Sequence, residues 1–130
     1  MKYLFVLVLF SLLNTPAYAQ KCSDTMTQTD MNQCAGEEYK KADAQLNKVY
    51  EKVLARAEAA QKTQLKAAQN AWIRFRDTDC AFQTSATEGG SIHSMMLAQC
   101  MQIKSQARTK ELEALLDCKE GDMTCALKPE

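Results

Sequence analysis

Six cysteines are the residues of this chain that are best suited to chemistry. They are Cys22, Cys34, Cys80, Cys100, Cys118 and Cys125. An even number of cysteines in a short chain outside the cytoplasm is typical of disulfides. Structural zinc sites usually need closely spaced ligand pairs, whereas the closest cysteines here are Cys118 and Cys125 and the single histidine is His93. The sequence therefore predicts disulfides, with no metal and no other cofactor.

The spacing of the cysteines also suggests how they pair. Cys80 and Cys100 are placed symmetrically about Gly90. If Gly89-Gly90 is the turn of a helical hairpin, both cysteines lie at one depth on neighbouring helices, where a bridge needs Cα atoms roughly 5.5 Å apart. A different pairing among the first four cysteines is the alternative. We predict three disulfides: Cys22–Cys34, Cys80–Cys100 and Cys118–Cys125.

The stretch Gly89-Gly90-Ser91-Ile92-His93 is the best candidate for a binding site. Glycine lets a backbone approach a partner closely, and the first N–H groups of a following helix have no partner within it. Backbone amides, Ser91 and His93 could then donate to carboxylates in a cleft. The alternative is a plain tight turn in which Ser91 caps the helix. No spaced Ser/His/Asp set accompanies the lone histidine, so we predict a binding protein and no enzyme.

Three polar residues share one face of the first predicted helix. Asp43, Asn47 and Tyr50 are separated by four and three positions, which places them on one side of an α-helix. They could form a recognition strip for a partner. They could also satisfy one another or bond to the second helix, because buried polar groups need partners. We favour the structural interpretation.

A second polar group surrounds Trp72, which is predicted to lie in the core. Arg76 and Asp79 are three positions apart and can pair on a helix. Asp79 also falls within the apolar stripe of that helix, between Phe75 and Phe82. The pattern predicts a half-buried Arg76–Asp79 bridge that fixes packing. Presentation of these charges to a partner is the alternative.

The elements that position these residues are helices. Between Glu37 and Glu88 the chain has no glycine or proline, and helix-forming residues dominate. Apolar residues recur at helical spacing in three segments, 31–53, 65–82 and 92–116. The first stripe is Met31, Ala35, Tyr39, Ala42, Leu46, Val49 and Val53; the second is Leu65, Ala68, Trp72, Phe75 and Phe82; the third is Ile92, Met95, Met96, Ile103, Leu112, Leu115 and Leu116. Thr27 and Asp30 match a capping box for the first helix. Gly121 is the residue at which we expect the third helix to end.

A bend must separate the first two segments. One helix from Glu37 to Glu88 would be about 78 Å long, far more than a domain of this size spans. The stripe fades near Ala60 to Thr63, where we place the bend. The fold class is thus all-α, a disulfide-braced three-helix bundle that runs up, down and up.

The start of the chain predicts export. A basic Lys2, an apolar run over residues 4–13 and Ala17-Tyr18-Ala19 are typical of a signal peptide cleaved after Ala19. Residues 20–130 then form a single helical domain, with an N-terminal segment 20–30 and a C-terminal tail 118–130. Lys21 before Cys22 does not fit a lipid-attachment cysteine. Without Lys2, fifteen basic and sixteen acidic residues remain, and this balance disfavours nucleic acid or membranes as partners.

Four ordered motifs together resemble a known family. They are Met31-Asn32-x-Cys34-Ala35, Ala42-Asp43-x-x-Leu46-Asn47-x-x-Tyr50, Ala68-Gln69-x-Ala71-Trp72-Ile73-x-Phe75-Arg76-Asp77-x-x-Cys80 and Gly89-Gly90-Ser91-Ile92. From about Cys22 to Leu116 the chain resembles small exported bacterial proteins related to the N-terminal domain of the lysozyme inhibitor LprI. The resemblance implies a cysteine-bridged helical domain outside the cytoplasm. For one branch of the family it also implies inhibition of chicken-type lysozyme.

Two functions follow as expectations. The first is a periplasmic or secreted protein that inhibits a chicken-type lysozyme by inserting Gly89 to His93 into the enzyme cleft. The second is an envelope adaptor that binds another envelope protein through a helix face. The first expects a bare polar tip at Gly89–His93, and the second expects a large exposed apolar patch.

Overall fold

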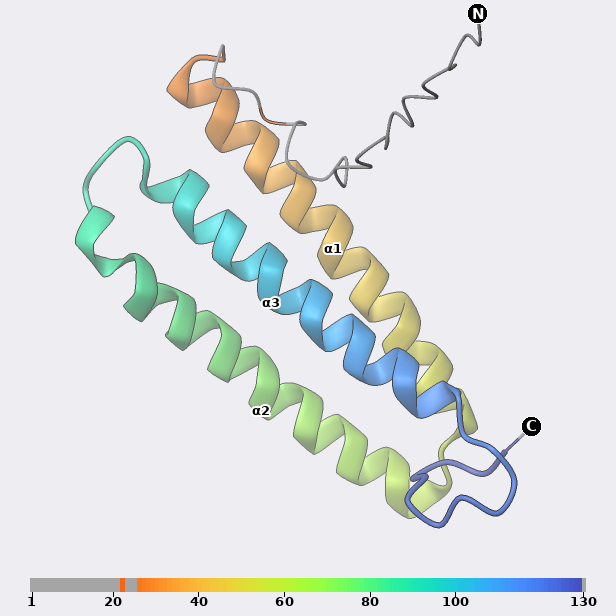
Figure 1. Cartoon of the computed structure of the whole chain (residues 1–130). Helices are drawn as coiled ribbons and strands as arrows, with labels where there is room; N and C mark the ends of the chain where they lie inside the picture. The colour runs from red at the N-terminus through yellow and green to blue at the C-terminus, as the bar shows by residue number, and fades with distance from the viewer. Residues whose placement is uncertain (1–21, 23–25, 130) are drawn as a thin grey trace, which may run out of the picture.

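The computed structural model describes Cys22 and residues 26–129. The signal peptide predicted for residues 1–19 lies outside the described residues. The described part contains α1 (Gln28–Arg56), α2 (Ala59–Thr84), the 3-10 helix η2 (Ser85–Thr87) and α3 (His93–Leu116), with no strand among them. The three long helices run up, down and up (Figure 1). The all-α three-helix prediction is confirmed.

The start of α1 is fixed by its own side chains. The Thr27 hydroxyl accepts from the Asp30 backbone N–H at 3.2 Å, and the Asp30 carboxylate accepts from the Thr27 N–H at 3.3 Å. These two bonds form the capping box that the sequence predicts. The apolar stripe then buries Ala35, Ala42, Leu46, Val49 and Val53.

The bend between α1 and α2 lies at Ala57 and Glu58, three residues before the predicted position. Ala57 leaves the helix with an extended backbone and is buried in the core. Glu58 then starts α2, and the Gln61 side chain accepts from its N–H at 2.9 Å. Residues 60–63, where the bend was predicted, form the first turns of α2.

The third helix is the centre of the bundle. α3 lies between α1 and α2 and packs along both, most extensively on α1 (Figure 1). Its buried residues are Ala98, Ser105, Thr109 and Leu112. Small side chains at three of these positions allow the helices to approach closely.

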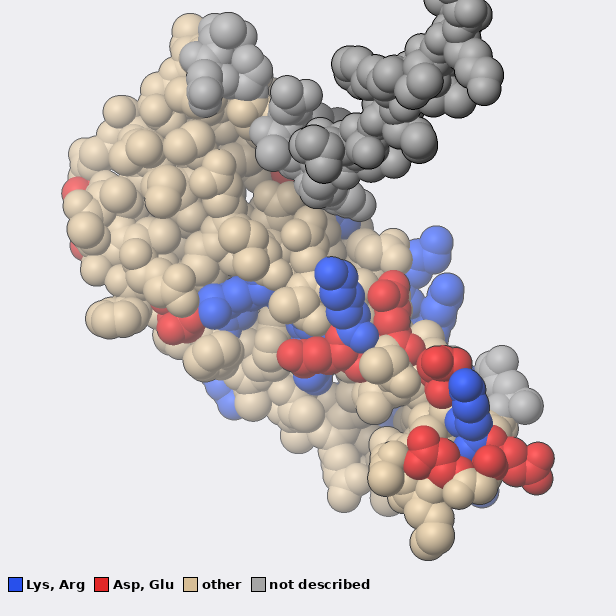
Figure 2. All heavy atoms as spheres, viewed as in Figure 1, with Lys and Arg blue, Asp and Glu red and all other residues tan. Residues whose placement is uncertain are grey.

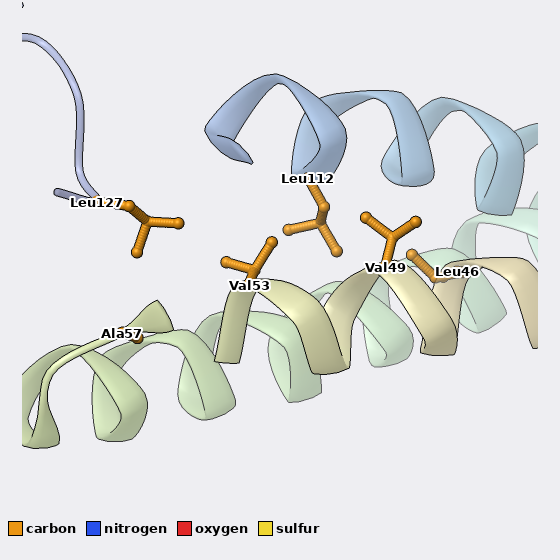
Figure 3. Close-up of a cluster of buried hydrophobic side chains, with 6 residues drawn as sticks. All are labelled: Leu46, Val49, Val53, Ala57, Leu112 and Leu127. Carbon is orange, nitrogen blue, oxygen red and sulfur yellow. The ribbon is translucent and has the colours of Figure 1, made fainter. Parts of the chain in front are cut away.

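The apolar core is concentrated near the α1–α2 bend. Figure 3 shows Leu46, Val49, Val53, Ala57, Leu112 and Leu127 grouped there. Leu127 comes from the C-terminal tail, which folds back over the bend. Arg56 ties the tail down, because its guanidinium donates to the carbonyl oxygens of Leu116 at 2.9 Å and Lys128 at 2.7 Å. The tail therefore completes the core.

Disulfides brace the bundle beyond this core. The structure contains the three predicted pairs, Cys22–Cys34, Cys80–Cys100 and Cys118–Cys125. Cys80 of α2 and Cys100 of α3 have Cα atoms 5.7 Å apart. This bridge lies in the half of the bundle farther from the apolar core, where it holds the hairpin of α2 and α3 together.

Both predicted ends of the third helix were wrong. α3 begins at His93, its N-cap is Ile92, and no side chain caps it. The His93 N–H bonds to the Gly90 carbonyl at 3.2 Å, so Ser91 lies inside a turn and cannot be the cap. At the other end, α3 stops at Leu116 and Gly121 belongs to a later turn. Within the described residues, every helix is too polar or too short to cross a membrane.

Candidate functional site

The turn between α2 and α3 projects from one end of the bundle. It passes through η2 into Glu88 and the glycine pair, and residues 88–92 are all exposed. Gly89 has a positive φ of 77°, a conformation that side chains with a Cβ rarely adopt. Gly90 has a close neighbour, because a Cβ there would lie 3.1 Å from the Thr87 carbonyl oxygen. The backbone of this turn thus requires glycine at position 89, and a side chain at position 90 would crowd the Thr87 carbonyl.

Two hydrogen bonds attach the turn to the neighbouring elements. The Asn32 side chain of α1 donates to the Ser91 carbonyl at 2.9 Å. The ring nitrogen Nδ1 of His93 lies 2.9 Å from the Thr87 hydroxyl. The Thr87 hydroxyl donates to the Thr84 carbonyl at 2.7 Å, so it accepts from Nδ1–H of His93. We call Gly89 to His93 the tip; its backbone is anchored to α1 and η2 while its outer side remains accessible.

The end of the molecule that carries the tip has little charge. Residues 80–103 contain a single charged side chain, Glu88. Residues 26–36 also contain a single one, Asp30. Figure 2 shows the charged side chains gathered toward the end where the C-terminus lies, and a mostly uncharged surface at the opposite end. Both charges at the tip end are negative, although the chain as a whole is nearly neutral.

The predicted polar residues form a cluster inside the bundle around Arg76. Arg76 is 6% exposed, and its guanidinium bonds to Asp43 of α1 at 3.0 Å and to Asp77 at 2.9 Å. The guanidinium also lies over the rings of Tyr39 and Trp72. Burial lowers the pKa of Arg76, but the hydrogen bonds and charges around it outweigh burial and raise the pKa above its ordinary value. The cluster joins α2 to α1.

The pairing predicted for Arg76 was wrong. Asp79 does not bind Arg76; it forms an ion pair with Lys104 of α3 and accepts from Gln83 at 2.7 Å. The hydrogen bond from Lys104 lowers the pKa of Asp79. Asn47 is exposed and donates to Asp43 at 3.4 Å. Arg76 reaches across to α1 because its position on α2 faces inward, whereas Asp79 lies toward the flank near α3.

Two aromatic residues assigned to the core lie on the surface. Phe75 is 57% exposed and Phe82 is 77% exposed. The buried side of α2 consists instead of Gln69, Arg76, Cys80 and Thr84. The signal in the sequence is Cys80: it must face α3 to bridge Cys100, so residues four positions before and after it also turn inward. Phe75 and Phe82 are off that stripe.

The described residues contain no group of three or more His, Cys, Asp and Glu side chains that could hold a metal ion.

Comparison with known proteins finds one matching family and two relatives. The family described as lysozyme inhibitor LprI matches residues 19–112. An uncharacterized protein of Rhizobium meliloti is 35% identical over 123 residues, which cover 82% of this chain and 88% of that protein. The uncharacterized protein YecT of Escherichia coli is 32% identical over 111 residues, which cover 72% of this chain and 68% of that protein. No solved structure matches significantly.

Proposed function

Because the chain belongs to the LprI lysozyme-inhibitor family, we propose that it is an exported binding protein that inhibits a chicken-type lysozyme. It acts in the periplasm or after secretion, and its tip, Gly89 to His93, enters the enzyme cleft. The observation that carries this proposal is the shape of the tip: an exposed glycine turn whose backbone is hydrogen-bonded to the Asn32 side chain and the Thr87 carbonyl. A braced loop loses little freedom on binding, which favours affinity.

The chemistry of the tip suits the cleft of a glycosidase. Such a cleft contains two carboxyl groups a few ångströms apart. Backbone N–H groups and the Ser91 hydroxyl are donors that could bind carboxylates. The carboxylates of Glu88 and Asp30 at the same end favour approach to a basic enzyme, because opposite potentials steer encounter. The small charge of the whole chain adds little to this steering.

A lysis assay tests the proposal. Chicken-type lysozyme is added to a peptidoglycan suspension with and without the oxidised protein, and turbidity is followed. We expect slower lysis in proportion to the protein added, and no slowing at micromolar excess would reject inhibition. The double variant Ser91→Ala/His93→Ala should weaken inhibition while far-UV circular dichroism stays unchanged. Met123→Ala is the control, because Met123 is 98% exposed in the distant tail.

The second candidate function is the adaptor role. The observation that favours it is the pair of exposed aromatic side chains on α2, Phe75 and Phe82. Variants of Phe82 separate the two functions: an inhibitor that works through its tip keeps its activity when Phe82 is replaced, and an adaptor loses its partner.

A further inference from the structure

A chain of hydrogen bonds fixes the tautomer of His93. The Thr87 hydroxyl has a single proton, which it donates to the Thr84 carbonyl oxygen. The contact of 2.9 Å between that hydroxyl and Nδ1 of His93 is therefore a hydrogen bond only when Nδ1 carries the ring proton. Neighbouring bonds in such a chain strengthen each other. In the neutral ring Nε2 is left with a lone pair, so it is an acceptor, whereas the sequence alone suggested a donor.

The backbone at the end of α2 sets the direction of this chain. A carbonyl oxygen can only accept, and the Thr84 carbonyl belongs to the last residue of α2. Thr84 is buried, and its own hydroxyl donates to the Cys80 carbonyl at 2.8 Å. Cys80 is in turn bridged to Cys100 of α3. The proton on Nδ1 is thus fixed by the scaffold, and it does not depend on which molecule approaches the tip.

The other ring nitrogen of His93, Nε2, is open to a partner molecule. It has no hydrogen-bond partner among the described residues, and no buried side-chain nitrogen or oxygen in the described part of the chain lacks one. Nε2 must therefore reach solvent, although His93 as a whole is half-buried. Metal ions also bind such a nitrogen, but the described residues contain no group of three His, Cys, Asp and Glu side chains that could hold one. A hydrogen bond from a donor is the interaction that Nε2 supports best.

The cleft of a glycosidase contains one donor and one acceptor. One of its two carboxyl groups is the general acid and carries a proton, whereas the other is ionised. A protonated carboxyl group donates a hydrogen bond, and an ionised one only accepts. The hydroxyl of Ser91, which is exposed and makes no hydrogen bond among the described residues, can donate to the ionised group. Nε2 of His93 can accept from the protonated group, so the tip presents a side chain that matches each.

On the basis of the function proposed above, we propose that His93 determines the specificity of the tip: its Nε2 accepts a hydrogen bond from the protonated general acid of the lysozyme. The Ser91 hydroxyl then donates to the ionised carboxylate. In a cleft where both carboxyl groups are ionised, the lone pair of Nε2 faces an anion with no proton between them, which is unfavourable. The tip therefore selects the cleft of a glycosidase from other acidic clefts.

The tautomer of His93 can be measured without a lysozyme. His93 is the single histidine of the chain, so its ring signals in a long-range proton–nitrogen correlation spectrum of the oxidised protein need no further assignment. We expect the neutral ring to carry its proton on Nδ1. Thr87→Val removes the hydroxyl but keeps its shape, and it should give a mixture of both tautomers. A wild-type ring that is neutral and carries its proton mainly on Nε2 overturns the proposal.

Two amide variants test the role of Nε2 in the lysis assay. His93→Gln places an amide oxygen near the position of Nε2, whereas His93→Asn places its amide near Nδ1 and leaves the position of Nε2 empty. We expect the inhibition constant to rise at least about tenfold for His93→Asn and to stay within about threefold for His93→Gln. Met123→Asn in the distant tail is the control, circular dichroism checks folding, and His93→Ala replaces an asparagine variant that does not fold. Equal inhibition by the asparagine and glutamine variants overturns the proposal.

Calorimetric titration identifies the group that His93 meets. The second protein is a lysozyme whose general-acid glutamate is replaced by alanine. We expect His93→Asn to weaken binding at least about tenfold against the unmodified enzyme and less than about twofold against this variant. An equal loss against both enzymes overturns the pairing with the general acid. A wild-type protein that has the expected tautomer but does not bind lysozyme rejects the proposed function itself, and the pairing with it, so the two failures are distinguishable.

Discussion

Arg76 of α2 and Asp43 of α1 are joined inside the bundle by an ion pair of 3.0 Å. The two helices are otherwise separated by α3 over much of their length (Figure 1). Ser105 of α3 completes the junction, because its hydroxyl lies 3.4 Å from the same guanidinium nitrogen. All three helices therefore meet at one buried charge.

Removing Asp43 should destabilise the fold more than removing a surface charge. Asp43→Ala leaves the buried guanidinium with Asp77 as its remaining acidic partner, and we expect the free energy of unfolding to fall by about 1–3 kcal/mol. The lower part of that range applies because the Asp43 side chain is 37% exposed. Urea unfolding followed by circular dichroism measures the change. Glu111→Ala removes a partner of Arg108 on the surface and should cost less than about 1 kcal/mol; an equal loss in both variants would contradict a special role for Arg76.

The two glycines with positive φ provide a matched pair for testing the tip. Gly89 has φ 77° and Gly121 has φ 83°, and a Cβ at either position would meet no neighbour within 4 Å. Replacing either by Ala strains the backbone by about 1–2 kcal/mol. We expect similar shifts in the urea midpoint for both variants, but weaker lysozyme inhibition for Gly89→Ala alone. Inhibition that falls equally in both would show that stability, rather than tip shape, controls it.

The C-terminal tail should contribute to stability although the family match ends at residue 112. Leu127 is 5% exposed in the core, and Leu127→Ala should lower the free energy of unfolding by about 2–4 kcal/mol. The double variant Cys118→Ser/Cys125→Ser frees the tail and should cost about 2–3 kcal/mol through the unfolded state. Met123→Ala is the control in the same tail. Unchanged unfolding midpoints would mean that the tail does not contribute to the stability of the fold.

Ionisation of the tyrosines should be coupled to unfolding at alkaline pH. A chain that starts at Gln20 keeps two tyrosines, Tyr39 and Tyr50, and burial raises the pKa of both above the ordinary value. Because the folded pKa is higher than the unfolded pKa of about 10, the folded state holds the phenolic protons more tightly. This contribution to stability is present below about pH 10 and is lost as pH rises through the folded pKa.

Absorbance at alkaline pH measures this ionisation directly. The midpoint should lie above 10 in buffer and move to about 10 in concentrated urea. Two tyrosines that titrate at the same pH with and without urea would contradict the burial of Tyr39 and Tyr50.

The parts of the fold that follow from local chemistry were predictable. Thr27 and Asp30 carry their own capping signal, and the symmetric placement of Cys80 and Cys100 about Gly90 indicates the hairpin. The bend was displaced because it depends on a tertiary contact: Ala57 leaves α1 to fill the core beside Leu127. No local breaker marks that position.

The side chains that face each neighbour were harder to predict. Hydrophobicity alone assigned Phe75 and Phe82 to the core, whereas the inward side of α2 follows Cys80 and Arg76. Arg76 pairs with Asp43, thirty-three positions away, and a rule for residues three apart on one helix cannot find such a partner. The tip was identified from its glycines, while its anchoring by Asn32 depends on how α1 lies against the turn.

The apolar core and the tip lie at opposite ends of the bundle (Figures 1 and 3). Replacements in the glycine turn therefore leave the packing around Leu112 untouched, and the proposed binding surface is separated from the apolar core. Under the proposed function, the exposed side chains of the tip can therefore change during evolution while the scaffold at the other end is kept.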